Sequence, residues 1–265
     1  MLAAQRQELI LDRIRRTGGV RVADLVESLA VSDMTVRRDL DVLEARGALR
    51  KVHGGAMAPD GVRTEEPGFA AKATRQADEK HAIARAAAEL VPPHGAVGLS
   101  AGTTTALVAE YLVDVPGLTV VTNSLRAAEV FHRAERPDRT VALTGGFRTP
   151  SDALVGPLAL ASIRGLNLDV LVLGVHGMQE RAGFTTPNLM EAETDRALVE
   201  ASATLVVAAD HSKWGTVGIS TIAPLDRCDV LVTDDGLDPG SRAVLADHVD
   251  RLVVARARPG EGNGS

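Results

Sequence analysis

The sequence predicts an α/β protein in which a small winged helix-turn-helix domain precedes a larger domain with a Rossmann-like parallel sheet. Three short helical patterns and a Gly-Gly turn occupy the first 56 residues, and a stretch rich in Pro, Gly and charge follows them. From there on, apolar strands alternate with helices, which indicates a parallel sheet covered on both faces. We therefore expect three parts: a DNA-binding domain (1–56), a linker (57–75) and an α/β domain (76–265).

Composition and length are consistent with a globular protein of two domains. The chain has 265 residues, of which 45% are hydrophobic and 24% charged, as in ordinary globular proteins. It contains no apolar run long enough to cross a membrane and no apolar signal-peptide region near its N-terminus, so we expect a cytoplasmic protein with no membrane partner. The single Cys228 cannot form an internal disulfide, which matches a reducing compartment.

The net charge of −6 is distributed unevenly along the chain. Residues 1–56 carry ten basic and eight acidic side chains, a balance of +2, whereas the remainder carries 19 basic and 27 acidic side chains, a balance of −8. This asymmetry favours a basic domain that approaches nucleic acid on an acidic body that does not. Only four of the 29 basic residues are lysines, which indicates an Arg-biased composition and weakens arginine content alone as evidence for DNA contact.

The first two predicted helices form the scaffold of the DNA-binding domain. The first covers 5–16 and ends at Gly18-Gly19. A short extended piece at 20–22 follows, and then a second helix covers 23–30. Only Val31 and Ser32 separate this helix from the next, which is the layout of a helix-turn-helix.

The third predicted helix extends from Ser32 to Gly47 and has the form of a recognition helix. Ser32 can accept a backbone N–H as the N-cap, and Gly47 ends the helix. An apolar face is formed by Val36, Leu40 and Leu43 at helical spacing. The opposite face carries hydroxyl and guanidinium groups in its first turns, as expected of a helix that enters the DNA major groove.

A small β-hairpin, the wing, is predicted after this helix. An alternating segment (48–53), a Gly54-Gly55 turn and a second short strand (56–58) form it. Candidate DNA-binding residues on the helix and the wing are Ser32, Thr35, Arg37, Arg38, Lys51 and His53. A three-helix bundle used only for protein contact is the alternative, but the order of three helices and a Gly-Gly wing favours DNA binding.

These motifs resemble the DeoR family of bacterial transcriptional regulators. The resemblance lies in Val22-Ala-Asp-Leu-Val, in Ser32-Asp-Met-Thr-Val-Arg-Arg-Asp-Leu-Asp-Val-Leu and in Val52-His-Gly-Gly-Ala. It implies an N-terminal domain that binds operator DNA, usually as a repressor. It further implies a C-terminal sensor that resembles ribose-5-phosphate isomerase and usually binds a phosphorylated sugar.

The α/β domain shows a regular series of strands and helices. Strands are predicted at 97–99, 118–121, 140–143, 169–173, 204–208, 229–232 and 252–254. Helices are predicted at 79–90, 106–112, 125–134 and 188–203. The strands end in small polar residues, and ligands of open α/β sheets bind at the carboxyl ends of the strands. Five such ends are expected to converge on one pocket: 100–105, 122–124, 144–146, 174–177 and 210–213.

The segment Gly102-Thr-Thr-Thr105 is the strongest candidate within this pocket. It connects a strand to a helix and offers backbone N–H groups, hydroxyls and the positive end of a helix dipole to an anion, most readily a phosphate. Lys213 could supply a cation to the same group. Candidates for binding hydroxyl groups are Asn123, His176, Glu191 and Asp210.

Each of these residues also has a purely structural interpretation. Thr104 and Thr105 can cap the following helix, and Asp210 can cap a turn with Ser212. Glu191 can stabilise the first turn of its helix, and His176 can be a satisfied polar residue under a loop. The effector pocket is therefore predicted from the set of strand ends and not from any one residue.

The resemblance to the DeoR family extends to this pocket. The matching residues are Gly102, Thr103, Thr104, Thr105, Asn123, Ser124, Gly145, Gly146 and Lys213. Three positions differ from the pattern that the family leads us to expect, namely Ser100, His176 and Asp195. The phosphate-binding segment is kept while charges near it change, so the effector can differ from the usual sugar phosphates.

Three functions follow from these predictions. The leading one is a repressor of a carbohydrate operon, released from operator DNA by a phosphorylated sugar or related metabolite. The alternative is a sugar-phosphate isomerase with a regulatory DNA-binding head, but we expect no enzyme because we find no paired carboxylates beside Lys213. A third is a DNA-binding protein whose second domain only oligomerises. We expect a homo-oligomer, a dimer or a tetramer, because specific operators are usually two-fold sites. No cofactor or metal site is predicted.

Overall fold

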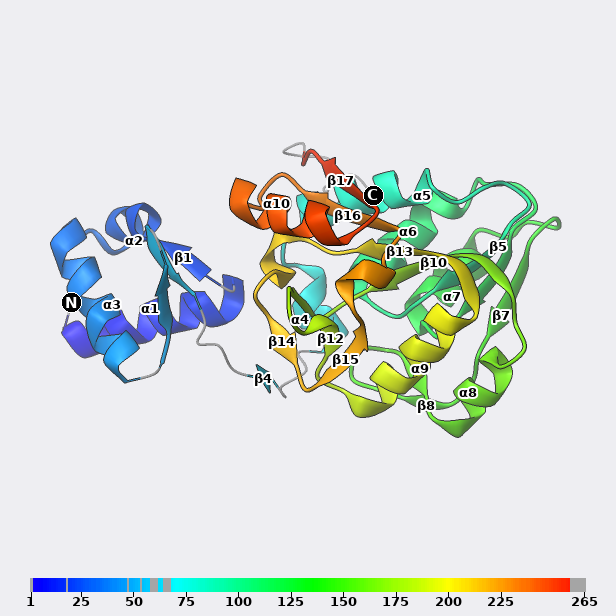
Figure 1. Cartoon of the computed structure of the whole chain (residues 1–265), viewed down its shortest axis with the longest axis horizontal. Helices are drawn as coiled ribbons and strands as arrows, with labels where there is room; N and C mark the ends of the chain where they lie inside the picture. The colour runs from blue at the N-terminus through cyan, green and yellow to red at the C-terminus, as the bar shows by residue number, and fades with distance from the viewer. Residues whose placement is uncertain are drawn as a thin grey trace. The chain divides into compact units, whose positions relative to one another are not determined.

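The computed structural model describes residues 2–17, 19–46, 48–52, 54–57, 62–63 and 68–257. The chain divides into two compact units, Met1–Val62 and Arg63–Ser265, and each is described by itself (Figure 1). The first unit extends beyond residue 56, where we had placed the end of the DNA-binding domain.

The first unit is a helix-turn-helix domain with a wing. Its elements are α1 (Ala3–Thr17), β1 (Gly19–Arg21), α2 (Val22–Leu29), α3 (Asp33–Ala45), β2 (Arg50–Val52) and β3 (Gly55–Met57). The three predicted helices are confirmed. The wing has one strand more than predicted, because β1 pairs antiparallel with β3 and gives the order β1-β3-β2. A Cβ atom on Gly55 would lie 2.2 Å from the Val20 carbonyl oxygen, so this pairing requires glycine there.

Apolar packing and one buried carboxylate hold this unit together. Ile10 of α1 packs with Val36 and Leu40 of α3 in a single core cluster. Asp39, only 4% exposed, accepts hydrogen bonds from Arg6 and from the Gln7 side chain on α1. A buried carboxylate is tolerated when it is paired and hydrogen-bonded, so Asp39 fixes α3 against α1.

The second unit is an α/β domain. Its helices are α4 (Phe69–Ala73), α5 (Ala77–Ala88), α6 (Thr103–Leu112), α7 (Leu125–Arg133), α8 (Pro157–Ile163), α9 (Leu189–Glu200) and α10 (Pro239–His248), with 3₁₀ turns η1 (His211–Lys213) and η2 (Leu225–Arg227). Its main strands are β5 (Ala96–Leu99), β6 (Thr119–Thr122), β7 (Thr140–Leu143), β10 (Leu168–Gly174), β13 (Ser202–Ala208), β16 (Val230–Asp234) and β17 (Arg251–Ala255). Shorter strands are β4 (Val62–Arg63), β8 (Phe147–Arg148), β9 (Leu154–Val155), β11 (Gly177–Gln179), β12 (Gly183–Thr186), β14 (Val217–Gly218) and β15 (Ser220–Ala223).

The main sheet confirms the predicted parallel architecture. Its order is β17-β16-β13-β10-β5-β6-β7, and all the pairs are parallel. Alternate residues of β10 point to opposite faces: Val170 and Val172 join the core under α5, α6 and α7, whereas Leu171 and Leu173 join the core under α8, α9 and α10. Both faces are therefore covered by helices (Figure 1).

Several predicted boundaries need correction. The predicted linker contains helix α4, and helix α6 begins at Thr103 instead of residue 106. The helix predicted over 188–203 ends at Glu200, because Ser202 already starts β13. A small antiparallel sheet of order β11-β12-β15 was not predicted at all. Among the described residues, no helix combines the length and apolar character needed to cross a membrane.

Candidate functional site

A cavity lies where β5, β10 and β13 end, at the edge of the sheet where a ligand is expected. Its walls include six of the predicted effector-binding residues: Gly102, Thr103, Thr104, His176, Glu191 and Lys213. They also include five polar or conformationally restricted residues that we had not assigned to effector binding: Lys72, Ser151, Thr186, Pro187 and Asp195. The cavity measures about 60 Å³.

The N-terminus of α6 forms one wall of the cavity. The N-cap is Gly102, with φ of +149°, and no side chain caps this helix start. Thr103 and Thr104 of the first turn line the cavity. Since the first N–H groups of a helix have no partner within the helix, this wall can bind an anion. Thr105 is instead fully buried and donates its hydroxyl to the Gly102 carbonyl oxygen at 3.1 Å.

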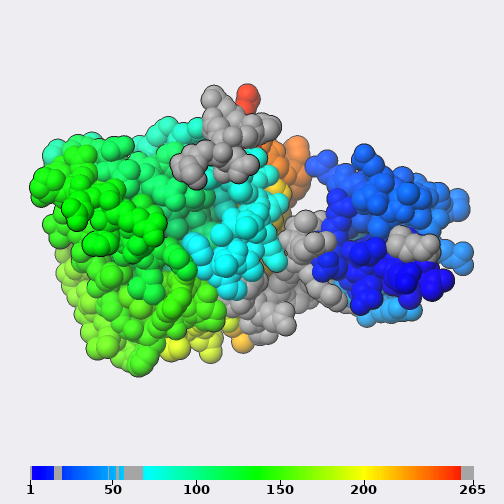
Figure 2. Space-filling view, turned by 180° about the vertical axis from the view of Figure 1, so that it is seen from behind, coloured from blue at the N-terminus to red at the C-terminus, as the bar shows by residue number. Residues whose placement is uncertain are grey.

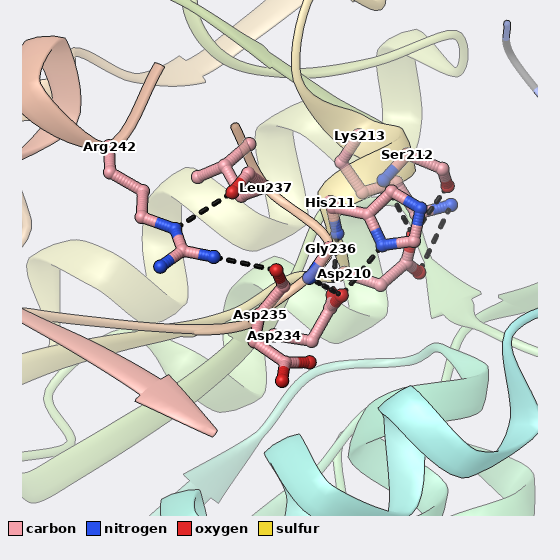
Figure 3. A network of polar contacts seen from close by, with 9 residues as sticks. All are labelled: Asp210, His211, Ser212, Lys213, Asp234, Asp235, Gly236, Leu237 and Arg242. Carbon is pink, nitrogen blue, oxygen red and sulfur yellow. Dashed lines mark hydrogen bonds and ion pairs between the residues drawn. The ribbon is translucent and has the colours of Figure 1, made fainter. Parts of the chain in front are cut away.

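Lys213 reaches the cavity from the 3₁₀ turn η1 after β13 (Figure 3). The turn is organised by Asp210, whose carboxylate accepts hydrogen bonds from the backbone N–H of Ser212 at 3.0 Å and from the Ser212 hydroxyl. Lys213 Nζ lies 4.0 Å from Asp210 Oδ2. Asp210 does not line the cavity, so it acts here as the turn cap that was its structural alternative.

A second buried carboxylate, that of Asp234 at the end of β16, also holds this turn in place. Asp234 is fully buried and accepts hydrogen bonds from the backbone N–H of His211 and from the N–H of Gly236, while His211 Nδ1 lies 2.7 Å from its Oδ2 (Figure 3). The hydrogen bond with Asp234 raises the pKa of His211, although burial opposes this. Burial acts to raise the pKa of Asp234, but the hydrogen bond and charge of His211 lower it overall.

The far side of the same loop is held by Arg242 of α10. Its guanidinium donates to the carbonyl oxygens of Leu237 at 2.8 Å and Asp235 at 2.6 Å, and Figure 3 shows it on the side away from Lys213. The position of Lys213 is therefore fixed by a chain of contacts that extends from η1 through the loop after β16 to α10.

Lys72 reaches the cavity from α4, within the segment that we had predicted to be a linker. Its Nζ donates to the Ser151 hydroxyl at 2.8 Å. Helix α4 is anchored nearby: the Phe69 N–H donates to the Pro150 carbonyl oxygen at 3.2 Å, and Arg126 lies over the Phe69 ring at 5.0 Å. In Figure 2 the cyan part of the chain, which follows residue 68, lies at the surface of the second unit beside the green part, which is centred near residue 130.

The C-terminal end of α4 is held by a buried lysine of α5. Lys80, only 3% exposed, donates to the carbonyl oxygens of Arg75 at 2.6 Å and of Lys72 at 2.5 Å. Burial lowers the pKa of Lys80 to about 8; the charge of Asp210 opposes this shift and that of Lys213 adds to it. Three of the four lysines of the chain are thus within electrostatic reach of one another around the cavity.

Two carboxylates of α9 line the cavity together with Lys72 and Lys213. Glu191 accepts hydrogen bonds from the hydroxyls of Thr149 at 2.6 Å and Thr186 at 3.4 Å. Asp195, one turn further along α9, is 7% exposed. Burial, followed by the charge of Glu191, raises the pKa of Asp195 well above its usual range. The expectation that no paired carboxylates accompany Lys213 is therefore wrong.

Several predicted effector-binding residues do not line this cavity: Thr105, Asn123, Ser124, Gly145, Gly146 and Asp210. Asn123 is buried, and its amide atoms have no hydrogen-bond partner among the described residues. Ser124 caps α7 by accepting the Ala127 N–H at 3.1 Å. Gly145 and Gly146 connect β7 to β8. Their roles toward an effector stay predictions.

Helix α3 and its N-cap carry four of the six predicted DNA-binding residues, namely Ser32, Thr35, Arg37 and Arg38. Ser32 caps it by accepting the Thr35 N–H at 3.2 Å. Arg37 pairs with Asp33 at 2.5 Å, and Lys51 of the wing pairs with Asp41. Exposed Arg38 has no ion pair with any other described residue. His53 lies outside the described residues.

Comparison with known proteins identifies the family of this chain. A family model described as the DeoR-like helix-turn-helix domain matches residues 6–62, and one described as the DeoR C terminal sensor domain matches residues 75–235. The chain belongs to the DeoR family. The family resemblance predicted from the sequence is thereby confirmed, and the protein is a regulator with a helix-turn-helix domain and a sensor domain.

Curated relatives match over nearly their whole length. The HTH-type transcriptional regulator GlpR of Haloferax volcanii is 37% identical over 97% of this chain and 100% of the relative. The glycerol-3-phosphate regulon repressor of Escherichia coli is 32% identical over 96% of this chain and 100% of the relative. The putative aga operon transcriptional repressor of Escherichia coli O157:H7 is 31% identical over 90% of this chain and 88% of the relative. Among solved structures, ribose 5 phosphate isomerase A from Neisseria gonorrhoeae aligns with 51% of this chain and 52% of its own, at 20% identity and a TM-score of 0.38.

Proposed function

We propose that this DeoR-family protein represses a carbohydrate-metabolism operon and is released from its operator by a phosphorylated sugar or related metabolite. The observation that carries the proposal is the cavity in which the N-terminus of α6 meets Lys213 and Lys72. Helix N–H groups and ammonium groups together are the donors that a phosphate dianion requires. The relatives named as repressors of the glycerol-3-phosphate regulon and the aga operon support the role as a repressor, and the first of these names includes a phosphorylated metabolite.

The size of the cavity suggests how an effector acts. A volume of about 60 Å³ holds roughly four water molecules, and hence an anion of the size of phosphate, whereas pockets for larger ligands measure about 300–1,000 Å³. We propose that part of the wall moves when a sugar phosphate binds. Lys72 is the candidate, because it belongs to the short helix α4 and reaches across to Ser151.

The same movement provides a route to the DNA. Helix α4 follows directly on the sequence that joins the sensor to the DNA-binding unit. A ligand shifts a two-state equilibrium only by its different affinity for the two states. Lys72 offers that difference, because it contacts Ser151 in the structure described here and can contact a phosphate when one is bound. The DNA-binding units of two protomers would then no longer match the operator.

The operator contacts that we propose are those of α3 and the wing. Arg38 reads base edges, with Ser32, Thr35 and Arg37 beside it, and Lys51 and His53 contact the phosphate backbone or the minor groove. We further propose that the protein acts in the cytoplasm as a dimer or tetramer, because one winged unit reads only a short site.

The decisive experiment replaces Lys213 with Ala. Full-length wild type and Lys213→Ala are tested for operator binding and for its loss on titration with sugar phosphates. Operator affinity should stay unchanged, while the concentration of sugar phosphate needed for release should rise at least tenfold. Arg164→Ala, which removes an exposed cation from the loop after α8, serves as the control. Release of Lys213→Ala at wild-type concentrations of sugar phosphate contradicts the phosphate assignment.

We do not propose an enzyme, although two carboxylates and two lysines line the cavity. Glu191 is already engaged by two threonine hydroxyls, which suits a residue that orients a ligand better than a base that must accept a proton. The measurement that decides is incubation of the full-length protein with ribose 5-phosphate. Formation of ribulose 5-phosphate that Glu191→Gln abolishes establishes the isomerase alternative.

A further inference from the structure

Asp195 has no function in the proposal so far, although it is a polar wall of the effector cavity. It belongs to α9, its residue is 7% exposed, and no hydrogen bond from another described residue reaches its carboxylate. Ionising a buried carboxyl group without a partner costs free energy, which is why the pKa of Asp195 is raised, and a cationic donor on a bound ligand would remove that cost.

Neighbouring side chains do not complete it. Arg196, the next residue of α9, donates to the Thr221 carbonyl oxygen at 3.0 Å and to the Ser220 hydroxyl at 2.8 Å, so only its charge acts on Asp195, and this effect is smaller than the opposing effects of burial and Glu191. Glu191, one turn earlier, adds a second negative charge and receives its own hydrogen bonds from threonine hydroxyls. Burial and the repulsion between these two carboxylates both raise the pKa of Asp195.

The cavity is consequently polar from one side to the other. The α6 N-terminus and Lys213 favour an anionic group, whereas Asp195 and Glu191 favour a cationic one. A neutral hydroxyl donates one hydrogen bond to a carboxylate but leaves the buried charge uncompensated. An ammonium group supplies both the donors and the charge, and charge-assisted hydrogen bonds are roughly twice as strong as neutral ones.

We propose that Asp195 is a specificity-determining residue that binds the ammonium group of a phosphorylated amino sugar. This inference rests on the proposed function, since it assumes that the phosphate of the effector is held at the α6 N-terminus and Lys213. The inference adds a statement about the sugar part of the ligand. This part carries an ammonium group on the side that faces α9.

The test compares ligands that differ only at one carbon. The probes are glucosamine 6-phosphate and galactosamine 6-phosphate, each against its neutral counterpart, glucose 6-phosphate or galactose 6-phosphate. Calorimetry at pH 7 on the full-length protein should give at least tenfold tighter binding of the better amino sugar phosphate than of its neutral counterpart. N-acetylglucosamine 6-phosphate, which has lost the charge, should bind no more tightly than glucose 6-phosphate.

Asp195→Asn removes the charge at almost constant volume and should abolish this preference while leaving neutral sugar phosphates bound as before. Its melting temperature should be no lower than that of wild type, because burial already favours the neutral form of Asp195, which the amide resembles in charge and volume. Glu193→Gln, an exposed residue on the same helix, is the matched control and should keep the preference.

The possible failures are distinguishable. Equal affinities of wild type for amino and neutral sugar phosphates overturn the role of Asp195 and leave the proposed function intact. The same holds if Asp195→Asn keeps the preference. If none of the five sugar phosphates and no inorganic phosphate binds to wild type, the phosphate site of the proposed function is overturned, and this inference with it.

Discussion

Replacement of Lys72 with Met separates binding of the effector from its effect on DNA. Methionine keeps most of the aliphatic length of lysine and removes the ammonium group. In the structure this group donates a hydrogen bond to the Ser151 hydroxyl at 2.8 Å, and Lys72 lines the proposed effector cavity. A hydrogen bond that involves a charged group contributes about 1.5–3 kcal/mol, so losing the contact with a phosphate should weaken effector binding roughly 10- to 100-fold.

The informative quantity is the coupling between the two sites and not the affinity alone. Coupling free energies between effector and DNA sites are typically about 1–3 kcal/mol. If Lys72 transmits the signal, Lys72→Met should retain most of its operator affinity even when the sensor is saturated with effector. Lys213→Ala lacks only a binding contact, so it should release the operator fully once enough effector is supplied.

The assay measures operator affinity by fluorescence anisotropy at zero and at saturating effector, with saturation verified by calorimetry for each variant. Arg164→Met, an exposed charge away from the cavity, controls for loss of one positive charge. The reasoning is refuted if saturated Lys72→Met releases the operator as completely as saturated wild type, because Lys72 would then only bind the ligand.

Three further predictions concern the DNA contact, the assembly and the pH dependence. Arg38→Ala should weaken specific operator binding by about 1–3 kcal/mol, whereas Lys51→Ala should weaken all sequences alike and reduce the salt slope by about one; equal operator affinity of Arg38→Ala and wild type at matched salt contradicts the first part. The fragment 76–265 should sediment as an oligomer at micromolar concentration and the fragment 1–56 as a monomer, and a monomeric 76–265 would argue against assembly through the sensor. The pKa of His211 is raised by Asp234 above the ordinary 6.5, so its stabilising contribution is fully present below pH 6.5 and is lost as the pH rises through the folded-state pKa. Chemical denaturation between pH 5 and 9 should therefore show the stability difference between wild type and His211→Gln shrinking above pH 6.5, and a difference that is constant across this range would disprove it.

The elements that could be predicted from the sequence depend on local patterns. Helix α3 follows from a capping Ser32 and apolar residues at helical spacing, and the structure shows the same cap and the same buried face. The parallel sheet follows from continuous apolar strands, since strands buried on both faces carry no alternation. The Gly102-Thr-Thr-Thr105 segment could be placed at the cavity because the position of ligands at strand ends is a general property of these sheets.

Helix α4 could not be predicted because it is defined by tertiary contacts. It has only five helical residues, and a helix this short is not stable by propensity alone. Its ends are held by partners far along the sequence, namely the Pro150 carbonyl oxygen for Phe69 and the Lys80 ammonium group for the carbonyl oxygen of Lys72. The rarity of lysine in this Arg-rich chain was the available signal, since Lys72, Lys80 and Lys213 are three of only four lysines.

The expectation that ligands bind at the carboxyl ends of the strands also predicted too many effector-binding residues. The width of the sheet explains why. Strands lie 4.7–4.9 Å apart, so the ends of seven strands are spread over roughly 29 Å. The cavity adjoins β5, β10 and β13, which are neighbours in the sheet, whereas β6 and β7 lie further toward one edge. The strand order decides which ends meet, and this order depends on long-range pairing that periodicity along the sequence does not encode. Asn123 and Gly145 follow β6 and β7, and for this reason they are absent from the described cavity wall.

The arrangement of charges around the cavity unites the sensing and the switching parts of the proposal. Lys213 is fixed by Asp210 and, through the loop after β16, by the His211–Asp234 pair, so it is a rigid binding contact. We assign the switching contact to Lys72, because it sits on a helix of five residues whose C-terminal end depends on the hydrogen bonds of buried Lys80. In the proposed mechanism, a phosphate that contacts both ammonium groups draws Lys72 toward it, and the resulting movement of α4 is transmitted to the sequence leading to the DNA-binding unit. With Asp195 as the proposed determinant of specificity, we assign affinity, specificity and release to three different residues, Lys213, Asp195 and Lys72, so that each should be altered separately by mutation.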